Sequence, residues 1–118
     1  MINKRLYALG RLKRGKRNKT EAAFEVLLKS WLQDGSILWY EFEGVKLKLA
    51  DKTFFTVDFA AMDNAGMLIM YEVKGAAAIF QDDAKVKIKF AAKLYPFKFM
   101  VAIPKPKKDG GGWDIVEI

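Results

Sequence analysis

Three charged residues stand inside two otherwise apolar segments of the chain. Asp58 lies in the run TFFTVDFAAM (53–62), and Glu72 and Lys74 lie in MLIMYEVK (67–74). Runs that are apolar on both faces are typical of central strands, where a charge is costly unless it is paired or holds a metal ion. Two carboxylates beside a lysine could bind a hard cation such as Mg²⁺ or Mn²⁺ and activate water for attack on a phosphodiester. A buried salt bridge of Lys74 with either carboxylate is the structural alternative.

The segment between these runs predicts how the three residues face one another. Residues 64–66 (Asn-Ala-Gly) suit a three-residue hairpin loop that ends on a left-handed glycine. A loop of that length places Asp58 opposite Glu72, and Lys74 two residues further along points to the same face of the sheet. A slip of one residue would separate the pair, so this prediction depends on the turn.

The elements that must position these residues follow from the periodicity of the chain. Asn18 with Glu21 three residues later is typical of a capping box, and it begins a helix that should end near Asp34-Gly35. The other elements expected are strands at 37–49 (with a bend at Gly44), 53–62, 67–74, 97–103 and 113–118, and a helix from Asp82 or Asp83 to Leu94. We therefore predict an α/β (α+β) domain over residues 18–118, preceded by a flexible basic arm over residues 1–17. Its order is helix, three-stranded antiparallel unit, helix and two strands, which build a mixed central sheet flanked by helices.

Composition narrows the possible functions. The chain has no cysteine and no histidine, which excludes disulfides, Cys–His zinc sites and histidine general bases. No apolar run is long enough for a membrane span and no secretory signal is visible, so a cytoplasmic location is compatible with the sequence. The net charge of +7 indicates a polyanionic partner, with nucleic acid as the leading candidate, although excess lysine could also serve solubility alone.

The basic residues gather in two places that could contact DNA. One is the N-terminal segment, and the other is a stripe of lysines at four-residue spacing on the second helix, which could equally be an ordinary solvated face. The predicted DNA-binding residues are Arg11, Lys13, Arg14, Lys16, Arg17, Lys19, Lys85, Lys89 and Lys93.

Asp58 followed by Glu72-Val73-Lys74-Gly75 resembles the core motif of the PD-(D/E)XK nuclease superfamily. The proline of that motif is absent, because Val57 precedes Asp58. The resemblance implies a restriction-endonuclease-like core and a further acidic residue on the first helix, for which Glu21 is the best match and Glu25 the second. It implies that Asp58, Glu72 and Glu21 bind Mg²⁺ or Mn²⁺ and that Lys74 assists the attacking water.

Within that superfamily, the short basic chain is similar to phage-type Holliday-junction resolvases of the endonuclease I type. This resemblance covers roughly residues 18–103 and implies an endonuclease acting on branched DNA, leaving a 5′-phosphate and a 3′-hydroxyl. Symmetric cutting of a junction would require a homodimer. The alternatives are a restriction-type or nicking nuclease on linear duplex and an inactive nucleic-acid-binding module. A structural or interaction protein, whose basic arm binds a protein partner, also stays open.

Overall fold

The computed structural model describes residues 16–76 and 82–118 of the chain. Its elements are α2 (Lys19–Asp34), β1 (Ile37–Phe42), β2 (Lys46–Ala50), β3 (Thr53–Thr56), β4 (Phe59–Asp63), β5 (Leu68–Val73), α3 (Asp82–Leu94), β6 (Lys98–Pro104), η2 (Lys107–Asp109) and β7 (Trp113–Glu117). Most of the predicted basic arm, including Arg11, Lys13 and Arg14, lies outside the described residues. Neither α2 nor α3 is long and apolar enough to cross a membrane, and the described part of the chain contains no other α-helix.

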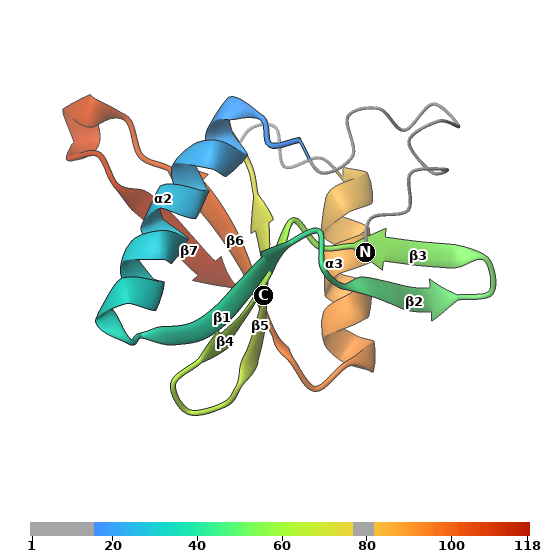
Figure 1. Ribbon diagram of the computed structural model, residues 1–118. Helices are drawn as coiled ribbons and strands as arrows, with labels where there is room; N and C mark the ends of the chain where they lie inside the picture. Colours follow the sequence, from blue (N-terminus) through green and yellow to red (C-terminus); the bar gives the residue numbers. More distant parts are fainter. Residues whose placement is uncertain (1–15, 77–81) are drawn as a thin grey trace.

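A mixed five-stranded sheet with the order β1-β4-β5-β6-β7 forms the centre of the molecule (Figure 1). β1 pairs antiparallel with β4 and β4 pairs antiparallel with β5, whereas β5 and β6 run parallel and are joined through α3. β7 pairs with β6 and forms one edge of this sheet. The fold is therefore α+β with a mixed sheet and two α-helices among the described residues, in agreement with the coarse prediction.

The two helices cover opposite faces of the sheet. Phe24 and Leu28 of α2 are fully buried in one apolar cluster, together with Phe59 and Tyr71 from the central strands. On the other face, Ile88 and Ala91 of α3 pack in a second apolar cluster, the α3 cluster, whose further buried members are Leu47, Phe55, Val57, Ala60, Met70, Phe99 and Val101. Burial of apolar side chains on both faces explains why β4 and β5 lack the alternation of a half-exposed strand.

The bend predicted at Gly44 lies between β1 and β2, whereas the prediction of one unbroken strand over 53–62 was wrong. Each segment is broken, so that β1 pairs with β4 in the main sheet while β2 pairs with β3 in a separate two-stranded hairpin. The ladder continues weakly across the break, where Glu43 N–H donates to Asp58 O at 2.8 Å and Val57 N–H donates to Val45 O at 3.2 Å. The outer half turns away because Leu47, Phe55 and Val57 are buried against α3 rather than in the sheet.

The start of α2 follows the predicted capping box. The side chain of Asn18 accepts from the N–H of Glu21 at 2.8 Å, and the side chain of Glu21 accepts from the N–H of Asn18 at 2.9 Å. Gly35 ends the helix in the left-handed conformation, with φ at 85°. The helix thus begins within one residue of the predicted position and ends at the predicted position, which fixes Glu21 in the first turn.

Candidate active site

Asp58 and Glu72 meet where the β4–β5 ladder ends. The pairing of Phe59 with Tyr71 continues to Asp58 opposite Glu72, as the three-residue loop predicted. That loop has the expected form, because Asp63 N–H donates to Met67 O and Gly66 has a φ of 84°. The structure therefore confirms the register that brings the two carboxylates together.

The two carboxylates are held by backbone N–H groups across the gap between the strands. Asp58 N–H donates to Oε1 of Glu72 at 3.1 Å, and Val73 N–H donates to Oδ2 of Asp58 at 2.8 Å. Glu72 is only 6 % exposed and is the one fully buried charged residue among those described. Each carboxylate thus accepts a backbone N–H at the point where the β4–β5 ladder ends. The second oxygen of each carboxylate takes no part in these backbone hydrogen bonds.

Lys74 lies beside this pair. Its Nζ is 3.5 Å from Oε2 of Glu72, and its own N–H donates to Ala102 O at 2.9 Å, which fixes its backbone to β6. Lys74 lies two residues after Glu72, and the structure therefore brings Asp58, Glu72 and Lys74 together, as predicted. A salt bridge with Glu72, the structural alternative, is also present.

Burial makes the carboxylate pair electrostatically costly. Burial is the largest cause that raises the pKa of Glu72, to about 8, and the charge of Asp58 adds to it despite the opposing charge of Lys74. The pKa of Asp58 is raised to about 6, again mainly by burial, although the hydrogen bond from Val73 lowers it. Without a further cation, the two groups therefore do not both carry a full charge near neutral pH.

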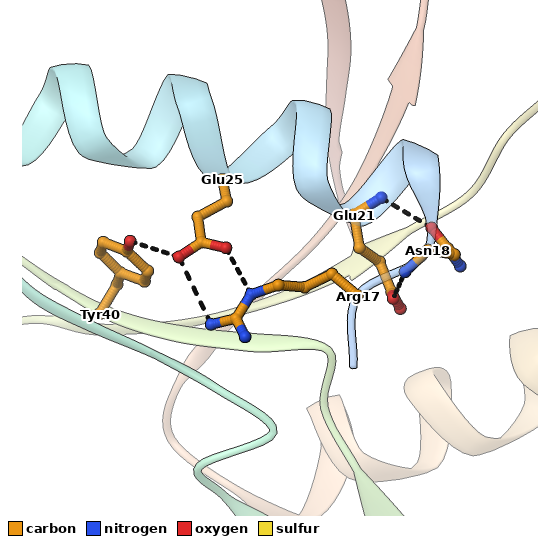
Figure 2. A network of polar contacts seen from close by, with 5 residues as sticks. All are labelled: Arg17, Asn18, Glu21, Glu25 and Tyr40. Atoms are coloured by element: carbon orange, nitrogen blue, oxygen red, sulfur yellow. Dashed lines mark hydrogen bonds and ion pairs between the residues drawn. The ribbon is translucent and has the colours of Figure 1, made fainter. Parts of the chain in front are cut away.

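Glu21 acts on this pair from the first turn of α2. Its negative charge raises the pKa of Asp58, so the side chain is near enough to be felt electrostatically. Its Oε1 is held in the capping box by Asn18 N–H (Figure 2). Within residues 16–76 and 82–118, no three His, Cys, Asp or Glu side chains are arranged to hold a metal ion together. Direct ligation by Glu21 therefore stays a prediction, for which the described geometry supplies only proximity.

Glu25, the second candidate on α2, belongs to a different network. Tyr40 O–H donates to its Oε2 at 2.7 Å, and the guanidinium of Arg17 forms an ion pair with it (Figure 2). Burial alone would raise the pKa of Glu25, but the hydrogen bonds from Tyr40 and Arg17 leave it lowered. Arg17, a predicted DNA contact, also lies 4.4 Å over the ring of Phe42, so this arginine fastens the start of α2 to β1.

Glu43 is an acidic residue near the site that the sequence reasoning missed. Glu43 is half-buried, and its charge raises the pKa of Asp58. Its φ of 49° belongs to the break between β1 and β2. The available signal was Gly44, because a Cβ there would lie 2.4 Å from Cγ of Glu41, which a regular strand would not require.

Both helices direct their N-terminal ends to the end of the sheet that carries the carboxylates. Arg17, just before α2, contacts Phe42 at the end of β1, which is paired with Phe59 next to Asp58. Since β6 runs parallel to β5, α3 must run back along the sheet and begins near the end of β5 (Figure 1). The positive ends of two helix dipoles therefore lie at the end of the sheet that carries the carboxylates.

The remaining predicted DNA contacts are exposed. Lys85, Lys89 and Lys93 lie on the solvent side of α3, while Lys16 and Lys19 are exposed at the start of α2.

The chain matches no protein-family model, and no curated protein or solved structure is similar enough to count as a match.

Proposed function

We propose that this protein is a metal-dependent endodeoxyribonuclease, with branched DNA as its preferred substrate. The observation that carries the proposal is the chemical identity of the buried pair. Amide side chains at positions 58 and 72 would accept the same two backbone hydrogen bonds without any charge to bury. Two carboxylates with raised pKa values are instead a site that gains stability when a divalent cation binds.

The donor set fits a hard cation such as Mg²⁺ or Mn²⁺. Asp58 and Glu72 each keep one oxygen outside their backbone hydrogen bonds, and these oxygens would hold the ion. When bound, the ion supplies an acidified water and neutralises charge on the phosphodiester. Lys74, 3.5 Å from Glu72, would orient the attacking water, and Glu21 would tune Asp58 or join the site through water.

The DNA backbone would approach the end of the sheet where α2 and α3 begin. The lysines of α3 and Lys16 and Lys19 would pair with phosphates on either side of the scissile bond. The net charge of +7 favours a polyanion over a neutral substrate. If junctions are cut symmetrically, two copies of the chain must act together, as a homodimer.

A second candidate is a nucleic-acid-binding module without catalysis. It is favoured by one observation, namely that the carboxylates already serve the backbone and Lys74 already neutralises Glu72. A nuclease of this kind that acts on linear duplex is the other alternative, and it differs only in substrate.

The test is a cleavage assay on a labelled four-way junction and a matched linear duplex, each with Mg²⁺, Mn²⁺ or EDTA. The variants Asp58→Asn and Glu72→Gln retain the hydrogen-bond acceptors, and Lys74→Met retains the stem of the side chain. Glu41→Gln, an exposed glutamate on β1, is the matched control. We expect metal-dependent cutting of the junction, lost by at least about 100-fold in the three site variants and unchanged in the control.

Cutting of both substrates would retain the nuclease and discard the junction preference. DNA binding without cutting in either metal would contradict the enzyme and leave the binding module.

A further inference from the structure

The hairpin that leaves the main sheet forms a groove with α3. A hollow of about 720 Å³ lies between them, lined by Leu49, Ala50, Thr53, Phe54, Phe55, Thr56, Val86, Lys87 and Phe90. Its size is within the range of about 300–1,000 Å³ that is usual for ligand sites. The lining is mainly apolar, its one cation is Lys87, and it includes no acidic residue among those described.

The walls of this groove expose aromatic and aliphatic side chains to solvent. Phe54 is 42 % exposed and Phe90 is 51 % exposed, whereas a core role would bury both rings. Val86, Phe90 and Leu94 recur every four residues and so form an apolar stripe along the outer side of α3, opposite the buried Ile88. The stripe is therefore a second apolar face of the helix, one that the described chain leaves uncovered.

Lysines lie beside the apolar residues of the groove. Lys46 Nζ lies 4.7 Å over the ring of Phe54, and Lys48 of β2 lines a second hollow next to the first. Lys89 and Lys93 follow the stripe on α3. This second hollow, of about 420 Å³, shares Leu49 and Ala50 with the first and reaches Leu94, so the groove extends along the helix; Asp51 is the acidic residue in its lining.

The groove and the carboxylates are continuous along the chain. Thr56 lines the groove and lies two residues before Asp58, where the β2–β3 hairpin meets the main sheet. Exposed aromatic rings bordered by lysines along an elongated groove are the combination that binds single-stranded nucleic acid, where bases stack on rings and cations follow the phosphates. An acidic amphipathic peptide would match the charge but would not account for the continuity with the site.

We propose that the groove between β3 and α3 binds unpaired nucleotides of the DNA substrate, which stack on Phe54 and Phe90. The inference deepens the proposed nuclease, because it makes an unpaired segment beside the cutting site the feature that is recognised.

Binding is measured in EDTA, so that the result does not depend on cleavage. The probe is a single-stranded oligonucleotide carrying 2-aminopurine, with anisotropy for affinity and 2-aminopurine fluorescence for stacking. Stacking on an aromatic ring should quench the 2-aminopurine fluorescence when the oligonucleotide binds. Phe54→Ala and Phe90→Ala should each weaken binding roughly 5- to 150-fold and reduce this quenching. Leu38→Ala, at a residue of β1 that is 58 % exposed, is the control and should change neither. Circular dichroism verifies that each variant is folded.

The lysines give an independent readout. Lys46→Met and Lys87→Met should each lower the slope of log affinity against log salt by about 0.7, the value per phosphate contact with a single strand. Lys29→Met, exposed on α2, should leave the slope unchanged.

The inference would be overturned if Phe54→Ala and Phe90→Ala bound the oligonucleotide with the same affinity and the same quenching as Leu38→Ala, even if the wild type cuts DNA. Binding of an acidic amphipathic peptide in the groove, in place of the oligonucleotide, would overturn it as well. Loss of stacking in the groove variants of a protein that never cuts DNA would support the groove and contradict the nuclease.

Discussion

Asp58 and Glu72 lie opposite each other at the end of the β4–β5 ladder, and Oε1 of Glu72 accepts the backbone N–H of Asp58 at 3.1 Å. Oδ2 of Asp58 in turn accepts the N–H of Val73, the residue after Glu72, at 2.8 Å. The same two side chains therefore end a sheet ladder and present the charge that a metal site needs. Asp58→Asn and Glu72→Gln keep the hydrogen-bond acceptor and remove the charge, so they separate these two roles. Truncation of either residue to alanine removes both.

The first prediction concerns pH in the absence of metal. Burial raises the pKa of Glu72 to about 8 and that of Asp58 to about 6, so the folded state binds these protons more tightly than the unfolded state. The stability that these two groups contribute is then fully present below their ordinary values of 3.8 and 4.5 and is lost as the pH rises through about 6 to 8. Urea unfolding in EDTA should show Glu72→Gln gaining stability over the wild type at pH 8 but not at pH 5. Parallel pH curves for the two proteins would contradict the raised pKa.

The second prediction concerns metal binding without DNA. At pH 8, Mg²⁺ or Mn²⁺ should raise the thermal unfolding midpoint, because the ion binds only the folded site. The free energy of unfolding should rise by about 1.4 kcal/mol when the ion concentration is ten times its dissociation constant. Asp58→Asn and Glu72→Gln should abolish the metal-dependent shift, and Glu41→Gln should retain it. A shift of equal size in all four proteins would mean that the ion binds elsewhere.

The third prediction separates two roles of Glu21. Glu21→Gln preserves the capping box but removes a charge that raises the pKa of Asp58. Stability should be unchanged, and the acidic limb of the cleavage rate should move to lower pH with a rate loss of about tenfold or less. Glu21→Ala should also destabilise the protein by about 1 kcal/mol, as should Asn18→Ala. A loss above about 100-fold in Glu21→Gln would instead identify Glu21 as a direct metal ligand.

The fourth prediction assigns Glu25 to stability. Tyr40 and Arg17 both hold its carboxylate, so Glu25→Gln and Tyr40→Phe should each cost about 1 kcal/mol or more of unfolding free energy. The metal-dependent thermal shift and the cleavage rate at 25 °C should be those of the wild type. If Glu25→Gln lost cleavage while Tyr40→Phe did not, Glu25 would belong to the site.

The local parts of the site could be predicted from the sequence because short-range rules determine them. Gly66 in a three-residue loop fixes the hairpin register, and that register alone brings Asp58 opposite Glu72. Asn18 and Glu21 fix the start of α2 in the same way. Both results depend on contacts between residues close together in the chain.

The bend at Gly44 could be predicted, but the separation of the β2–β3 hairpin from the main sheet could not, because tertiary packing decides it. The alternation of apolar residues around Leu47 and Phe55 fits a strand of the main sheet and a separate hairpin equally well. Only the burial of these two side chains against α3 distinguishes the two arrangements. The break also places the charge of Glu43 near enough to raise the pKa of Asp58, which simple alternation could not reveal. Exposure of Phe54 and Phe90 is a further result of that packing.

The hairpin geometry of the site has a consequence for the order of folding. The hydrogen bonds that position Asp58 and Glu72 join residues only 14 and 15 positions apart. Such local pairings form faster than the parallel pairing of β5 with β6, which must wait for the crossover through α3. The two carboxylates should thus be in contact before the core closes over them, so their charges are brought together while water still surrounds them. Pulsed hydrogen exchange would test this order, because the N–H of Val73 should be protected before that of Lys74, which is bound to β6.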